Sequence, residues 1–269
     1  MNKNIEIKNI LDNDINETVT TSVKKKKSKE KKQKDYTYYS RLYPRWAYIF
    51  IIFFWFSLDY TGLSNAIKIE QDFGINTPSF SLVIPSLLAI SLTLVFFRKD
   101  LIPKISKQIK EPSTYFYALI GPAIYIFSII VLAIVSILIG ADASTASENQ
   151  ETLNAIAANS NKVAYFFMVV ILGPILEELV FRYALINIFD VRKKWLKWIP
   201  YVMSIFLFAG IHEIGFFVAP SAESFFSLLS YLTISTTIVL TYVISGRRLV
   251  SAIIIHIIIN SFSIILGTL

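Results

Sequence analysis

The chain has 269 residues, of which 54% are hydrophobic and 17% are charged, with a formal net charge of +7 and no cysteine. A composition this apolar excludes an ordinary soluble domain and points to a membrane protein. The lack of cysteine excludes disulfide bonds, cysteine-based zinc sites and a thiol nucleophile.

Residues 1–45 are polar and unevenly charged. Eight lysines lie between Lys24 and Lys34, whereas the first 23 residues carry four acidic groups. Such a segment cannot bury enough apolar surface to fold, so we expect a disordered, basic cytoplasmic tail. Lysines directly ahead of a spanning segment usually act as a topology signal and an anchor to anionic lipids. We therefore expect lipid contact through Lys24 to Lys34 and no nucleic-acid partner.

Seven apolar segments follow the tail, and most are long enough to cross a hydrocarbon core of about 30 Å as helices. They occupy residues 47–63, 80–97, 115–140, 163–189, 198–218, 225–245 and 249–268. We predict an all-α, polytopic transmembrane bundle of about seven spans, three in residues 46–162 and four in residues 163–269. Within the long fourth segment, Gly173-Pro174 is a candidate for a kink or a re-entrant piece.

The loops between these segments alternate in charge. Basic residues gather in the tail, in loop 98–114, after the fourth segment and just before the last one, whereas loops 64–79, 141–162 and 219–224 are acidic. The positive-inside rule then places the N-terminus in the cytoplasm. The abundance of Asn, Ile and Lys suggests an integral protein of a bacterial cell membrane.

Three of the late segments carry polar residues inside apolar sequence. They are Glu177, Glu178 and Arg182 in the fourth segment, His212 in the fifth, and His256 and Asn260 in the last. Ionisable groups are costly in a membrane unless they are paired or hydrated, so these residues are candidates for a functional site. Counted at 1.5 Å per residue from the predicted cytoplasmic ends, all of them lie about 10–20 Å deep. They can therefore meet in one layer.

These residue types fit the hydrolysis of a peptide bond. A carboxylate in a low-dielectric cavity can act as a general base toward water. Imidazoles can bind a metal, position a water or donate to an oxyanion, and a side-chain amide such as that of Asn260 is a suitable oxyanion donor. Arg182, one turn from Glu178, would keep that carboxylate ionised. The two can equally form a purely structural pair, which leaves Glu177 to act.

Other chemistries for proteolysis in a membrane need features that the sequence lacks. There is no Gly-x-Ser-x-Gly motif and no aspartate pair with a Gly-x-Gly-Asp context. His212-Glu213 begins like the zinc motif His-Glu-x-x-His, but Phe216 stands where the second histidine is required. We interpret this match as accidental.

In this order and on separate helices, the three polar motifs resemble those of the CPBP (CAAX protease and bacteriocin-processing, or Abi) intramembrane proteases. The resemblance covers about residues 163–264. It implies that Glu177 activates the water with Glu178 and Arg182 as support, and that His212 and His256 complete the centre while Asn260 stabilises the oxyanion. The family is named as metalloproteases, yet its members have also been described as metal-independent glutamate proteases.

The sequence leaves the use of a metal open. Glu177, His212 and His256 make a plausible Zn²⁺ set, and the same residues with Asn260 make a metal-free site that activates water. We favour the metal-free form, because the sequence places no carboxylate to orient either imidazole.

These features predict an intramembrane endopeptidase that cleaves a membrane-associated peptide or protein tail near the cytoplasmic leaflet. The family name suggests a prenylated CAAX protein as substrate, whereas the bacterial composition favours a peptide precursor or a signal-peptide remnant. One alternative is a catalytically inactive scaffold or bacteriocin-immunity-type protein. Another is a small transporter, which would need a polar path across the whole membrane, and the outer halves offer mainly residues such as Ser230 and Ser235.

Overall fold

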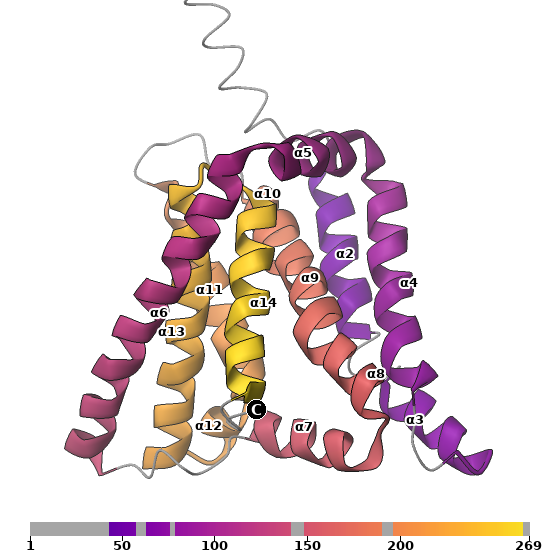
Figure 1. The fold of residues 1–269 in the computed structure, drawn as a ribbon, viewed down its shortest axis with the longest axis vertical. Coiled ribbons are helices and arrows are strands. Elements are labelled where there is room, and N and C mark those ends of the chain that lie inside the picture. The colour runs from indigo at the N-terminus through magenta and orange to yellow at the C-terminus, as the bar shows by residue number, and fades with distance from the viewer. Residues whose placement is uncertain (1–42, 58–62, 76–78, 141–147, 190–195, 266–269) are drawn as a thin grey trace, which may run out of the picture. The chain divides into compact units, whose positions relative to one another are not determined.

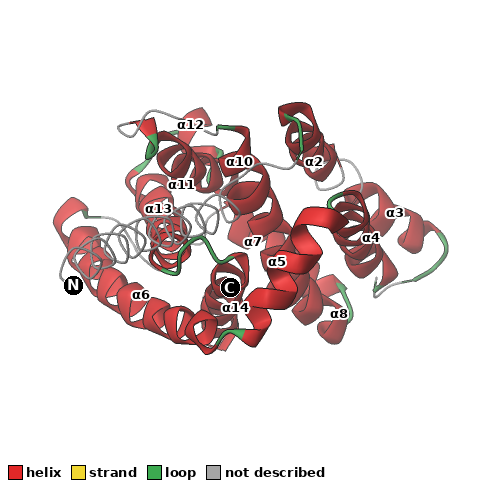
Figure 2. Ribbon diagram, turned by 90° about the horizontal axis from the view of Figure 1, so that it is seen from above, coloured by secondary structure: helices red, strands yellow, loops and turns green. Residues whose placement is uncertain are grey.

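The computed structural model describes residues 43–57, 63–75, 79–140, 148–189 and 196–265, which belong to one compact unit, Tyr43–Leu269. In these residues every regular element is a helix, as Figures 1 and 2 show. The predicted all-α class is confirmed. The predicted tail falls almost wholly on residues 1–42, outside the described residues.

The described part of each of the seven predicted apolar segments is mostly helical, although the segment 198–218 is interrupted at Glu213 and Ile214 before α12 (Gly215–Val218). The helices are α2 (Arg45–Ser57), α4 (Phe80–Phe96), α6 (Pro112–Ile139), the run from α8 (Lys162–Phe166) to α10 (Ile186–Ile188), α11 (Ile199–His212), α13 (Ala222–Ile244) and α14 (Leu249–Ile265). Of the described helices, α6, α13 and the run Lys162–Ile188 are long and apolar enough to cross a membrane. A fourth span results if α4 and α5 (Arg98–Lys110), which are bent by 103°, form one broken span. The helices α2, α11 and α14 are apolar but shorter.

Three stretches that the sequence analysis treats as loops contain further helices, so that part of the prediction is wrong. They hold α3 (Leu63–Asp72), α5 and α7 (Glu148–Asn159). In α5, Leu101, Ile105 and Gln108 face inward at helical spacing, whereas most of its lysines face solvent. The many charged residues of this stretch made its short buried face difficult to recognise from the sequence. Figure 1 shows α5 running across one end of the bundle and α7 across the other.

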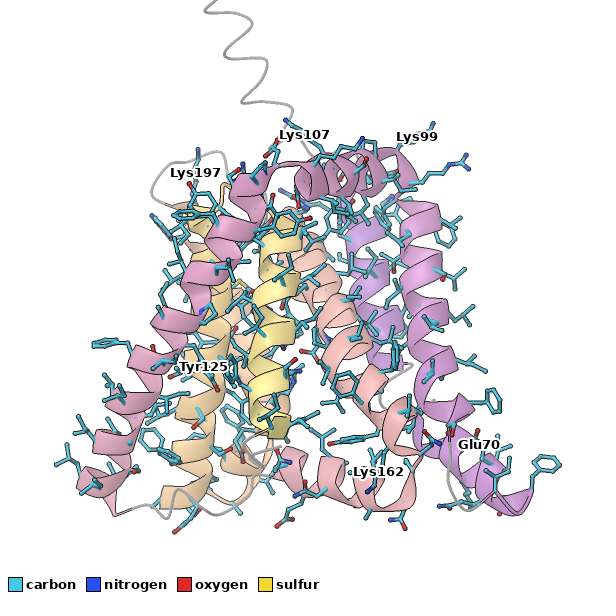
Figure 3. The ribbon with its side chains drawn as sticks, in the orientation of Figure 1. Glu70, Lys99, Lys107, Tyr125, Lys162 and Lys197 are labelled. Atoms are coloured by element: carbon cyan, nitrogen blue, oxygen red, sulfur yellow. The ribbon has the colours of Figure 1, made fainter. Side chains whose placement is uncertain are left out.

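Charge is distributed unevenly between the two ends of the bundle. Lys99, Lys107 and Lys197 lie at the end crossed by α5, and Glu70 and Lys162 lie at the opposite end (Figure 3). We call the first of these the α5 end. This distribution agrees with the alternation of charge along the sequence.

The last helix is packed closely against α6 and α13. A Cβ at Gly121 of α6 would lie 2.5 Å from the Ile255 side chain and 3.1 Å from Thr241 Oγ1. Gly121 therefore allows the close approach that small residues give to helices in membranes. Because His256 follows Ile255, this contact also helps to place the histidine.

Candidate active site

The glutamate pair lies on a short α-helix between two π-helices. The helix α9 (Gly173–Glu178) is preceded by the π-helix η2 (Phe167–Leu172) and followed by the π-helix η3 (Leu179–Leu185). The N–H of Gly173 donates to Met168 O, five residues back, and Pro174 has no N–H to continue an α-helical pattern. The sequence analysis placed an irregularity at Gly173-Pro174, and a change of helical geometry occurs there. Single π turns inside α-helices often mark functional sites.

Glu178 and Arg182 form an ion pair that is fully removed from solvent. Arg182 Nε lies 3.0 Å from Glu178 Oε2, and both side chains are 0% exposed. Arg182 Nη2 also donates to Ser235 Oγ of α13 at 3.3 Å, and the guanidinium lies 5.0 Å from the centre of the Phe208 ring. A buried charge is tolerated only with such partners, so this arginine fixes the position of Glu178.

The other oxygen of Glu178 holds His256. His256 Nδ1 lies 2.9 Å from Glu178 Oε1, and because the carboxylate accepts, Nδ1 donates its proton to it. A neutral His256 then presents an unprotonated Nε2, which lies 3.6 Å from Glu177 Oε2. The expectation that no carboxylate orients an imidazole is wrong for His256. The partner comes from another helix, 78 positions away along the chain.

His212 is oriented by its own helix. Its Nδ1 donates to the carbonyl oxygen of Phe208, one turn earlier, at 2.8 Å. Its ring stacks on the Phe208 ring at 4.4 Å between centroids and faces the Tyr231 ring at 5.0 Å. Its Nε2 is thereby turned toward Glu177 Oε2, 3.9 Å away. Phe208 and His212, one helical turn apart, are thus joined by both a hydrogen bond and a ring stack.

Glu177 differs from its neighbour in what its buried oxygen faces. The Oε2 atoms of both glutamates lack a hydrogen-bond partner among the described residues, but that of Glu178 lies 3.0 Å from the Arg182 guanidinium. The Oε2 of Glu177 faces the Nε2 atoms of His212 and His256 instead. Buried polar groups are usually hydrogen-bonded, and an oxygen that is not calls for an explanation such as a catalytic role or a bound water. Three acceptor atoms that converge in this way suit a molecule that donates, such as water.

Asn260 ties α14 to the π-helix in front of the glutamates. Its Nδ2 donates to Val169 O at 2.9 Å. One of its two N–H groups is therefore used inside the protein, and it joins the two helices that carry His256 and Glu177.

The structure thus brings Glu177, Glu178, Arg182, His212 and His256 into one cluster. Sequence reasoning missed the supporting role of Ser235. It also missed Glu213, a buried carboxylate that accepts a hydrogen bond from Ser227 Oγ at 2.5 Å. The position of Glu213 next to His212 was the available signal, but it was discounted together with the zinc motif.

The fit of a metal ion can be tested against these atoms. Glu177 Oε2 and the two Nε2 atoms are ligand types that zinc accepts, and the Nδ1–H bonds turn both Nε2 atoms inward as in metal sites. Tetrahedral zinc ligands lie about 3.3 Å apart, closer than the 3.6 and 3.9 Å found here. In the described part of the chain no three such side chains meet the geometry of a metal site. The ligand types fit zinc, while the spacing is wider than zinc requires.

Fold and site together define an α-helical membrane protein with a carboxylate–histidine centre among its helices. Residues 159–262 match the family model described as type II CAAX prenyl endopeptidase Rce1-like. This match includes all six predicted site residues and confirms the resemblance to the CPBP, or CAAX protease, family. The match covers residues 159–262 alone, which is less than half of the chain. Neither the comparison with curated proteins nor that with solved structures found a match.

Proposed function

We propose that the protein is a CAAX-type intramembrane endopeptidase in which Glu177 activates the attacking water. The observation that supports this most directly is the buried Oε2 of Glu177, which has no hydrogen-bond partner in the described part of the chain and faces two oriented imidazoles. Glu178, by contrast, is held by the Arg182 guanidinium at 3.0 Å and by His256 at 2.9 Å, as expected of a structural carboxylate. The family match supports the peptidase class.

In the proposed reaction, a water held between Glu177 and the imidazoles attacks the carbonyl carbon of the scissile bond. Its proton passes to the Glu177 carboxylate and from there to the leaving nitrogen as the C–N bond breaks. The products are a new carboxylate and a new amine. His256 can carry positive charge during the proton transfer because Glu178 stabilises its imidazolium through Nδ1–H. Asn260 has a second N–H that can donate to the oxyanion.

A resident zinc ion would be held by Glu177, His212 and His256. When bound, it would polarise the substrate carbonyl and lower the pKa of its water. We favour the metal-free form for this chain, and the wide spacing of the three atoms supports that choice.

The setting that we propose is a bacterial cell membrane crossed seven times, with the N-terminus and the α5 end in the cytoplasm. The lysines at the α5 end support this orientation. Substrates would be membrane-associated peptides or protein tails cleaved near the cytoplasmic leaflet, and Lys24 to Lys34 would bind anionic lipid.

No described contact favours the alternative of a transporter. Two of the hydroxyls that such a path would use are committed elsewhere. Ser235 accepts a hydrogen bond from Arg182, and Ser230 donates to Phe226 O of its own helix.

The proposal is tested by comparing membrane peptides from cells that contain wild-type protein with those from cells that contain Glu177→Gln. We expect peptides with new C-termini only with the wild type. Purified protein is tested in parallel on a farnesylated peptide with a C-terminal CAAX sequence, and on the same peptide without the lipid. Identical peptide sets from the two strains, with no cleavage of either probe, would refute the proposal.

A further inference from the structure

The helix α5 contacts two of the three helical segments that carry the site residues, the run from α8 to α10 and α14. Figure 2 shows α5 running from α4 toward α14 across this end of the bundle. Its buried face includes Asp100, Leu101 and Gln108, of which two are polar. Buried polar side chains need partners, and their partners here lie on η3 and on α14.

The first contact joins α5 to the glutamate-bearing helix. Tyr183 OH donates to Asp100 Oδ2 at 2.8 Å, and Lys104 Nζ lies 2.6 Å from the other carboxylate oxygen. Tyr183 directly follows Arg182 in η3, and both Tyr183 and Asp100 are buried.

The second contact joins α5 to the first turn of α14. Gln108 Oε1 accepts a hydrogen bond from Val250 N at 3.0 Å, and Gln108 is 2% exposed. The first N–H groups of a helix have no partner inside the helix, so Gln108 acts as an N-terminal cap supplied from another helix.

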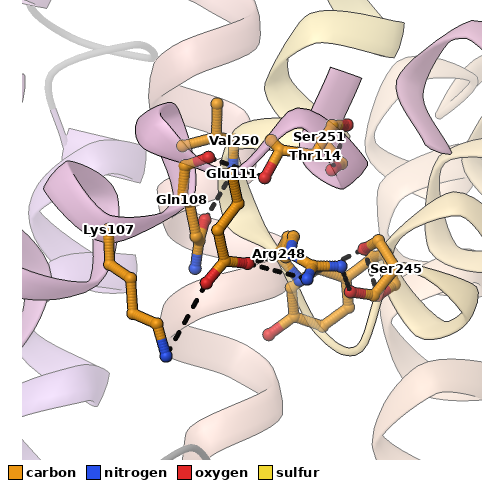
Figure 4. A network of polar contacts seen from close by, with 9 residues as sticks. Lys107, Gln108, Glu111, Thr114, Ser245, Arg248, Val250 and Ser251 are labelled. Carbon is orange, nitrogen blue, oxygen red and sulfur yellow. Dashed lines mark hydrogen bonds and ion pairs between the residues drawn. The ribbon is translucent and has the colours of Figure 1, made fainter. Parts of the chain in front are cut away.

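Further bonds reinforce this second contact (Figure 4). Arg248, just ahead of α14, donates to Glu111 Oε2 from Nε at 3.1 Å and from Nη2 at 2.7 Å. This guanidinium lowers the pKa of the Glu111 carboxyl. Ser251 Oγ donates to Thr114 O at 2.8 Å. The start of α14 is thus held at the corner between α5 and α6.

These contacts close a ring with the site itself. Tyr183 lies five residues after Glu178, within the π-helix η3. Val250 lies six residues before His256, and Asp100 and Gln108 are eight residues apart, which corresponds to about 9 and 12 Å along the α-helices α14 and α5. The bond between Glu178 and His256 completes the ring. Within this ring, α5 sets the separation of the two helices at the α5 end.

We propose that Asp100 and Gln108 are positioning residues, which act through Tyr183 and Val250 to hold His256 against Glu178 and Glu177. The effect on catalysis rests on the proposed peptidase function, whereas the effect on His256 does not. Loss of either contact lets one helix move relative to the other, and small displacements of catalytic groups strongly lower the reaction rate.

The test uses Gln108→Ala, Asp100→Ala and Tyr183→Phe. The last deletes a single oxygen and serves where Asp100→Ala does not fold. Gln108→Glu keeps the acceptor oxygen and should restore the wild-type behaviour. Ser106→Ala, at an exposed position of the same helix, is the matched control.

The first measurement needs no substrate. The chain has only two histidines, so protein labelled with ¹⁵N-histidine gives ring-nitrogen signals from two imidazoles alone, and the His256 signal is identified by its loss in His256→Ala. We expect the hydrogen-bonded Nδ1–H of His256 to shift or disappear in the three contact variants and to persist in Gln108→Glu and Ser106→Ala. The second measurement is cleavage of the farnesylated CAAX peptide, where kcat should fall about tenfold or more with KM within about twofold of wild type.

The two proposals fail in different ways. An unchanged His256 signal in Gln108→Ala and Tyr183→Phe would overturn the positioning role, even if Glu177→Gln abolishes cleavage. A His256 signal that responds as expected, together with cleavage that survives Glu177→Gln, would uphold the positioning role and refute the catalytic one.

Discussion

Glu177 and Glu178 are neighbours in the sequence, but they lie in different surroundings. Successive helical residues point about 100° apart, so the two carboxylates face different sides of α9. Glu178 is 0% exposed and holds Arg182 and His256. Glu177 is 17% exposed, and its Oε2 faces the imidazoles of His212 and His256 at 3.9 and 3.6 Å. We therefore assign support to Glu178 and chemistry to Glu177.

This assignment predicts that substitution of Glu177 lowers activity, whereas substitution of Glu178 lowers stability. Glu177→Gln should lower the cleavage rate about 100-fold or more, because it removes the base, and should leave thermal unfolding unchanged. Glu178→Ala should cost about 3–5 kcal/mol of folding free energy, because it strands the Arg182 charge. Cleavage of the peptide probe and thermal unfolding of both purified variants provide the check. A loss of stability in Glu177→Gln equal to that in Glu178→Ala would contradict the division of roles.

The metal-free form makes its own prediction. Cleavage by purified protein should continue at the wild-type rate in the presence of a chelator, and His212→Ala should change activity without changing the metal content. The measurement combines probe cleavage with elemental analysis of protein purified without added metal. Stoichiometric zinc that is lost in His212→Ala would show that the metal-bound form is the correct one, since each zinc ligand is needed for tight binding.

At the residue scale, the five clustered residues could be singled out in the sequence because ionisable groups stand out in apolar segments. The bond between Glu178 and His256 could not. It depends on how α9 and α14 are rotated toward each other, and neither segment alone carries that information. The same applies to Ser235, because α13 contains several hydroxyl residues and its sequence does not show that Arg182 donates to this one.

At the scale of the element, the transition from the π-helix η2 to α9 determines the direction in which the Glu177 side chain points. A Cβ on Gly173 would lie 3.0 Å from Met168 O and 3.8 Å from Glu177 Oε1. The first contact is with backbone that already accepts the Gly173 N–H, so it has little freedom to move. Gly210 in α11 offers a matched comparison, because a Cβ there would meet only the Phe217 ring, at 3.6 Å.

We expect Gly173→Ala to destabilise the protein by about 1–3 kcal/mol through overpacking and to lower the cleavage rate. Gly210→Ala should be neutral or stabilising by up to about 1 kcal/mol, as alanine favours the helix. Thermal unfolding and probe cleavage of the two variants give the comparison. A wild-type cleavage rate in Gly173→Ala would mean that the π-helical transition does not position Glu177.

The apolar elements could be predicted because long hydrophobic runs have few alternatives to the helix in a membrane. Helix α5 was missed, since its lysines obscured an inward face of only a few residues. Its role depends on Tyr183 and Val250, which lie far along the chain from it.

At the scale of the whole molecule, the charged ends predict the orientation in the membrane. The chain has no cysteine, so single cysteines introduced at Lys99, Lys197 and Glu223 can be labelled without background. We expect an impermeant reagent to label position 223 in intact cells, and positions 99 and 197 only after permeabilisation. Labelling of position 99 in intact cells would invert the orientation and place the α5 end outside.

The central claim is that Glu177 activates water for peptide hydrolysis. Its most direct measurement is the incubation of purified wild-type and Glu177→Ala protein with membrane peptides in ¹⁸O-water, followed by mass spectrometry of the products. The account predicts that wild-type protein produces peptides with one ¹⁸O in each new carboxylate, and that Glu177→Ala produces none. The same labelled products formed by Glu177→Ala at the wild-type rate would contradict it.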